Sequence, residues 1–100
     1  MSDYTKIDAQ EVKHKSGYHV FSAGRQYIGY RNGEVFYKIE RELGRNPDTN
    51  KIHEYIYKLS VFNENMEKVS LPKEELDELI DKIVQAELFL TGFEIEIVEE

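Results

Sequence analysis

Apolar and polar side chains alternate through residues 18–39, and two glycine-containing breaks divide this alternation into three short runs. A repeat of two residues is typical of β-strands that bury one face. The Ala-Gly pair at residues 23–24 and the Asn-Gly pair at residues 32–33 both predict hairpin turns, and Asn-Gly is the strongest short-range signal for a type I′ turn. The pattern therefore predicts two consecutive β-hairpins.

The Asn-Gly turn at residues 32–33 also predicts a register for the second hairpin. A two-residue loop would place Arg31 opposite Glu34 and Phe36 opposite Gly29. Opposite charges would then face each other, and the phenyl ring would cover a stretch of bare backbone. Both pairs support a hairpin with this register.

Residues 34–43 fit two patterns. Phe36, Ile39 and Leu43 recur at helical spacing, and Gly44 would be a suitable helix end. The same segment is rich in β-branched and aromatic residues, which are typical of strands, and an Asn-Gly turn has to lead into a second strand. We favour the strand.

The remainder of the chain predicts a strand, a helix and a final strand. Residues 52–62 alternate as a strand, and residues 72–90 carry apolar side chains at the i, i+3, i+4, i+7 spacing of an amphipathic helix that ends at Gly92. Residues 93–98 alternate again. The predicted fold is α+β, an antiparallel meander of about four to five strands packed on one C-terminal helix, with a final C-terminal strand. Residues 1–100 are expected to form a single domain.

A single helix is too narrow to cover both faces of such a sheet. The predicted helix is roughly 28 Å long and about 10 Å wide, enough for one face of about five strands. The other face would stay open, and monomers seldom expose large apolar patches, so we expect a partner, a ligand or a homodimer there. Together with Val20, the side chains expected on this open face are aromatic or basic: Tyr18, Arg25, Tyr27, Arg31, Phe36 and Lys38.

Composition narrows the functional classes. The chain has 100 residues, of which 40% are apolar and 12% aromatic, which is enough to bury a core. It contains no cysteine, so disulfides, thiol catalysis and thiolate zinc sites are excluded. We find no signal-peptide pattern and no apolar run long enough to cross a bilayer, so no membrane association is expected and the predicted location is cytoplasmic.

Charge is distributed unevenly along the chain. Residues 1–58 hold ten Lys/Arg and eight Asp/Glu, a net charge of +2, whereas residues 59–100 hold three and twelve, a net charge of −9. The acidic half would attract a basic protein surface and repel phosphate backbones within roughly 8 to 10 Å at physiological salt.

Motifs for catalysis or for cofactor binding were not found. His14, His19 and His53 lack the spacing of a metal site, and no phosphate-binding or nucleophile motif is complete. We therefore predict no catalytic residue, no metal and no cofactor, and expect the protein not to be an enzyme.

The order of elements resembles one known group of proteins. A β-meander followed by "KVSLPKEELDELIDKI" is similar to the positive-cofactor and Whirly-like single-strand-binding domains, in which a curved sheet precedes a dimerising helix. This resemblance implies a single-stranded nucleic-acid binder whose aromatic and basic sheet residues stack on bases. Those domains carry a basic sheet, however, whereas this one is nearly neutral.

The acidic half suggests a second hypothesis. Its carboxylates could occupy a groove built for phosphates, and in size and acidity the chain resembles small inhibitors from phages or mobile elements, of the anti-CRISPR or DNA-mimic kind. We favour this protein-binding hypothesis over single-stranded nucleic-acid binding and over a structural homodimerisation domain. The carboxylates expected to form this phosphate-like row are Glu67, Glu74, Asp77, Glu78, Asp81, Glu87, Glu94 and Glu96. Of these, Glu74, Asp77, Glu78 and Asp81 are the predicted partner-binding residues.

Overall fold

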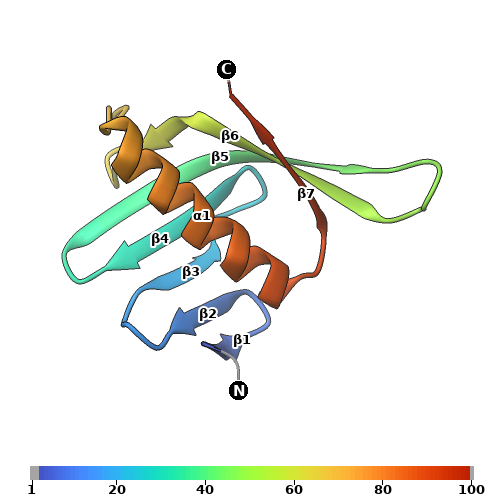
Figure 1. Ribbon diagram of the computed structural model, residues 1–100, viewed down its shortest axis with the longest axis horizontal. Coiled ribbons are helices and arrows are strands. Elements are labelled where there is room, and N and C mark those ends of the chain that lie inside the picture. Colours follow the sequence, from blue (N-terminus) through green and yellow to red (C-terminus); the bar gives the residue numbers. More distant parts are fainter. Residues whose placement is uncertain (1–2, 100) are drawn as a thin grey trace.

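The computed structural model describes residues 3–99, which form one mostly antiparallel sheet and one helix (Figure 1). The elements are β1 (Tyr4–Asp8), β2 (Glu11–His14), β3 (His19–Ser22), β4 (Tyr27–Asn32), β5 (Val35–Arg45), β6 (Ile52–Phe62), α1 (Lys73–Leu90) and β7 (Glu94–Val98). The seven strands lie in sequence order, and neighbours are antiparallel except for β6 and β7. The predicted α+β class, C-terminal helix and final strand are confirmed, although the sheet is larger than expected.

Helix α1 crosses one face of the sheet diagonally and returns the chain to the far side of β6 (Figure 1). Because the chain crosses over through a helix, β7 runs parallel to β6 and not antiparallel to it. Strands β5 and β6 continue past the ends of the other antiparallel strands as a twisted two-stranded arm. The helix, the arm and β7 therefore meet at one side of the molecule.

The ends of α1 follow local sequence signals. Pro72 precedes the first turn, where the carboxylates of Glu74 and Glu75 complement the positive end of the helix dipole. At the other end, Thr91 donates its hydroxyl hydrogen to the Glu87 carbonyl at 2.8 Å, and Gly92 has a φ of +68°. Glycine adopts this conformation without strain, which explains why the helix stops at the predicted place.

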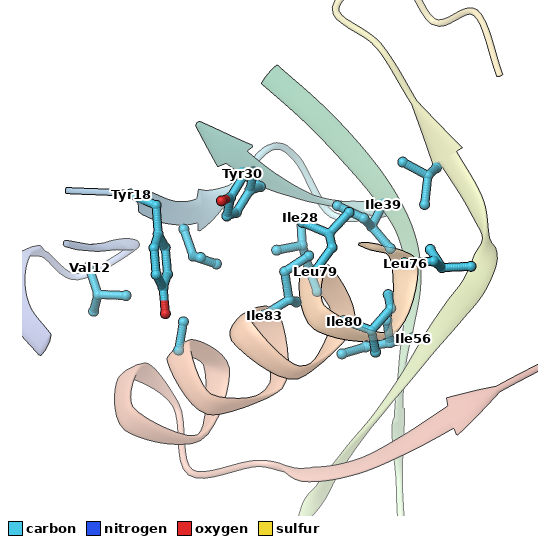
Figure 2. Close-up of a cluster of buried hydrophobic side chains, with 13 residues drawn as sticks. Val12, Tyr18, Ile28, Tyr30, Ile39, Ile56, Leu76, Leu79, Ile80 and Ile83 are labelled. Carbon is cyan, nitrogen blue, oxygen red and sulfur yellow. The ribbon is translucent and has the colours of Figure 1, made fainter. Parts of the chain in front are cut away.

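The core lies between α1 and the face of the sheet that it covers (Figure 2). The apolar stripe of the helix packs on side chains that strands β2 to β6 direct toward it. The fully or almost fully buried side chains of the strands are Val12, Val20, Ile28, Tyr30, Ile39, Ile56 and Val61. Tyr18, just before β3, joins them, and those from the helix are Leu76, Leu79, Ile80, Ile83 and Ala86. The predicted stripe is therefore confirmed.

The β4–β5 hairpin forms, but its predicted register is wrong. Asn32 pairs with Val35, so the turn consists of Gly33 and Glu34. Among these turn residues only Gly33 has a positive φ, +61°, which fits a type II′ turn with glycine at its first central position. Each β4 residue pairs with a β5 residue two positions later than predicted. Because side chains on a strand alternate, this even shift leaves every side chain on its predicted face.

The β3–β4 turn differs from the prediction by an odd number of residues. Ser22 pairs with Ile28 across a loop at residues 23–26, three positions beyond the partner that a two-residue turn would give. An odd shift turns β3 over relative to β4. The prediction that Tyr18 and Val20 face away from the helix is therefore wrong, because both are buried in the core, with exposed fractions of 3% and 0%.

Residues 35–45 form a strand, as favoured over the helix. The pairing of β5 with β6 shifts between Ile39, which faces Val61, and Arg41, which faces Ile56. Extra β6 residues bulge at this point, and β-bulges increase local twist, consistent with the bend where the arm begins.

Gly29 provides a test of the packing on the uncovered face. Phe21, and not Phe36 as predicted, covers this glycine, and a Cβ built on Gly29 would lie 2.2 Å from the Phe21 ring. We expect Gly29→Ala to lower the free energy of unfolding by about 1 to 3 kcal/mol, because the ring must move. In a Phe21→Ala background the same change should cost almost nothing, since alanine is less costly than glycine in a strand. Urea unfolding of the four proteins measures this coupling, and equal effects of Gly29→Ala in both backgrounds would contradict it.

Candidate interaction surfaces

The two groups of predicted partner-binding residues lie on opposite sides of the sheet. Glu74, Asp77, Glu78 and Asp81 are exposed on the solvent side of α1. The aromatic and basic residues of β4 and β5 alternate with the core residues and so face away from the helix. One flat partner surface cannot contact both groups, so the structure separates two candidate surfaces.

The first surface, here called the ring face, is the side of the sheet that α1 does not cover. One row across β3 to β6 contains Phe21, Gly29, Lys38 and Phe62 in register. The half-buried rings form pairs across the strands. The Phe21 and Phe36 centroids lie 5.9 Å apart, and those of Tyr27 and Phe62 lie 6.2 Å apart. These rings form a band across four strands.

Basic groups on the ring face are partly neutralised. The Arg31 guanidinium lies 5.5 Å from the centroid of the Phe21 ring, a cation–π contact, and 3.6 Å from the Glu11 carboxylate. Glu11 also lies 2.7 Å from Nδ1 of His19. Lys38 is half-buried between Gly29 and Phe62. The ring face is therefore aromatic with only a weak positive character.

Four of the six residues predicted for the open face come together there: Tyr27, Arg31, Phe36 and Lys38. Tyr18 lies in the core, and Arg25 lies in the exposed β3–β4 loop, where its carbonyl accepts a hydrogen bond from Arg41 at 3.3 Å. The prediction missed Phe21 and Phe62. The alternation of β3 would have identified Phe21 if the turn had been placed correctly.

The second surface, here called the acidic face, is the solvent side of α1 with the adjoining edge of β7. Glu74, Glu75 and Asp81 form no ion pair within residues 3–99. Lys58 pairs with Asp77 and lowers the pKa of this carboxyl group, and Glu78 lies 3.9 Å from Lys82. Three of the five carboxylates on the solvent side of α1, namely Glu74, Glu75 and Asp81, therefore have no close cation among residues 3–99.

Glu87 does not belong to the acidic face, contrary to the predicted row of carboxylates. It lies between α1 and the arm with an exposed fraction of 1%, beside the fully buried Glu54 and the almost fully buried Arg41. Arg41 donates from Nη1 to Glu54 at 2.9 Å, and the same nitrogen lies 3.9 Å from Glu87. From Nη2 it donates to the Ser22 hydroxyl oxygen at 2.8 Å. One guanidinium group therefore lies close to two buried carboxyl groups.

The geometry of this buried cluster favours a bound proton. Oε1 of Glu54 and Oε2 of Glu87 have no hydrogen-bond donor in the part of the chain that the structure describes. Burial, reinforced by the charge of Glu54, raises the pKa of Glu87 to about 8 against the opposing effect of Arg41. A proton held between the two carboxyl groups would remove their repulsion and supply the missing donor. The role of the cluster that follows from this geometry is to hold α1 to the arm.

Comparisons with known proteins add no functional information, since no family model, no curated protein and no solved structure matches the chain. Within residues 3–99 there is no group of three or more His, Asp or Glu side chains that could hold a metal ion. No helix within residues 3–99 is both long enough and apolar enough to cross a membrane.

The buried cluster predicts a pH-dependent stability. The folded pKa of Glu87, about 8, lies above the ordinary value of 4.5, so its stabilising contribution is complete below pH 4.5 and is lost as the pH rises to 8. Over this range it should lower the free energy of unfolding by up to about 1.4 kcal/mol per pH unit. Glu87→Gln should remove this decline and make the variant more stable than the wild type at pH 8.5.

Urea unfolding at pH 5, 6.5 and 8.5 measures the effect. Glu75→Gln, which removes an exposed carboxylate from the same helix, is the matched control and should keep the wild-type pH profile. Parallel profiles for the wild type and Glu87→Gln would show that no proton is shared.

Proposed function

We propose that the chain is a non-enzymatic acidic protein that binds a basic surface of another protein through its acidic face. The observation that carries this proposal is a row of exposed carboxylates along α1 that have no cationic partner in the described part of the chain: Glu74, Glu75 and Asp81. They share the solvent side of one rigid helix with Asp77 and Glu78. Positions three or four residues apart are neighbours on a helix surface, so the negative charges form a fixed array.

Such an array favours rapid encounter with a basic partner. Charges concentrated on one side of a protein steer association, and the attraction weakens as salt screens it beyond about 8 to 10 Å. The basic residues of α1 are Lys73 and Lys82, and Lys82 is engaged with Glu78 and with the face of the Tyr18 ring. A partner would therefore meet a net negative helix surface.

The partner class that fits this surface best is a protein that itself binds phosphates. A row of carboxylates on a rigid helix can occupy a groove lined by Lys and Arg for nucleic acid, and so prevent nucleic acid from entering. We propose that the protein acts in this way in the cytoplasm, as an inhibitor of a nucleic-acid-handling or defence enzyme of the kind that phages and mobile elements produce.

The proposal predicts binding that depends on α1 charge and on salt. A triple variant, Glu74→Gln with Glu78→Gln and Asp81→Asn, should lose roughly tenfold in association rate at low salt, because steering charges are removed. The measurement is capture of proteins from source cells on immobilised wild type and variant, followed by binding kinetics with each purified captured protein at two salt concentrations.

Phe36→Ala with Tyr27→Ala is the control for this experiment, since it changes the ring face and leaves α1 intact. Captured proteins with a basic surface that the triple variant loses and the ring-face variant keeps would support the proposal. Equal capture by the triple variant and the wild type would contradict it.

The ring face favours a second candidate, a single-stranded nucleic-acid binder. Its half-buried rings present a stacking platform, and Arg31 and Lys38 lie beside them. Stacking of one base on an aromatic side chain contributes about 1 to 3 kcal/mol. The Glu11 carboxylate beside Arg31 reduces the attraction for phosphates, which is why we place this candidate second.

A labelled oligonucleotide tests the second candidate. Tyr27→Ala with Phe36→Ala should weaken binding of a single strand by about tenfold or more, because two stacking platforms are lost. Fluorescence anisotropy at two salt concentrations measures the effect, with the α1 triple variant as control. Absence of binding at both salt concentrations would eliminate this candidate. If the ring-face variant instead converts a dimer to a monomer in sedimentation, the ring face is the interface of a homodimer.

A further inference from the structure

A groove runs between α1 and β7 on the acidic face. It has a volume of about 470 Å³, and its apolar floor consists of Ile80, Val84 and Ile97. Carboxylates of Asp77, Asp81 and Glu99 line it as well. The groove therefore combines an apolar floor with an acidic rim, which is the environment that suits a long cationic side chain.

Lys58 shows how this groove accommodates such a side chain. Its ammonium group bonds to Asp77 and lies 3.2 Å from the Glu99 carboxylate, while its side chain is only 15% exposed. The methylene stem is thus covered and the charge is held at the rim. Lysine and arginine commonly bury their stems along apolar surface in this way.

One carboxylate of the groove remains available. Asp81 is exposed, lies one helical turn beyond Asp77, and forms no ion pair within residues 3–99. Val84, next to it on the floor, is only partly buried. Three carboxylates against the single lysine leave a net negative charge in the groove, so a second cation would be attracted to this end of it.

We propose that the groove between α1 and β7 binds a lysine or arginine side chain from a basic segment of the partner protein, with the cation at Asp81 and the stem on Val84 and Ile97. This inference rests on the proposed function, because it assigns the anchoring point of the basic partner. Charge complementarity and the internal example of Lys58 support this occupant over an acidic or an apolar one.

A hexa-arginine peptide is a suitable probe. Titrated at low salt into the full chain labelled with ¹⁵N, it should shift the amide signals of Asp81, Val84 and Ile97 more than those elsewhere on α1. Asp81→Asn should weaken binding about fivefold or more. Glu75→Gln removes the same charge from the same helix outside the groove, and should change the dissociation constant less than twofold.

Val84→Ser tests the apolar floor without a change in charge, and should weaken binding about threefold. Equal effects of Asp81→Asn and Glu75→Gln, with the largest shifts near Glu74, would overturn the groove assignment and leave the acidic face as the binding surface. No binding by the wild type at low salt would overturn both this inference and the proposed function.

Discussion

The packing of one amphipathic helix on one face of a seven-stranded sheet is the constraint on which the rest of the structure depends. It gathers the core between two layers, so every strand from β2 to β6 directs one set of side chains toward α1. It also leaves two outer surfaces of different chemistry. The solvent side of the helix is charged because the polar positions of the helical repeat face outward. The uncovered side of the sheet carries rings because alternate side chains of the strands point away from the helix.

The buried Arg41–Glu54–Glu87 cluster fixes how the helix meets the arm. Burial of three ionisable groups is costly, and an apolar trio would often be as stable or more stable. Its geometry, however, joins β5, β6 and α1 to the end of β3 and the β3–β4 loop, since Arg41 also donates to Ser22 and to the Gly24 carbonyl at 3.0 Å. Directional bonds of this kind specify one docking angle for the end of α1, and β7 follows directly from that end. The groove beside β7 therefore depends on the cluster for its shape.

Long periodic elements could be predicted from the sequence, but the exact residues that form each turn could not. The apolar stripe of α1 and the alternation of β7 extend over enough residues to show which segment is a helix and which is a strand. On the strands, the face of each side chain depends on whether a turn is displaced by an even or an odd number of residues. The even displacement at Gly33 left the faces of β5 correct, and the odd displacement before Tyr27 reversed β3 and moved Tyr18 into the core. Glu87 stands four residues after Ile83 and seven after Ile80, so the helical spacing already places it on the apolar stripe. Its partners Arg41 and Glu54 could not be predicted, because they lie far away in sequence.

The two outer surfaces can act independently under physiological conditions. The molecule is 24 Å thick along its shortest axis. Charges interact over about 8 to 10 Å at physiological salt, so the carboxylates of α1 have little effect on a ligand at the ring face, whereas at about 0.01 M salt the screening length of roughly 30 Å exceeds the thickness. A polyanion at the ring face would then be repelled through the protein. The net charge of −7 is thus a poor guide to what the ring face can bind, and the local balance of Arg31, Lys38 and Glu11 decides it.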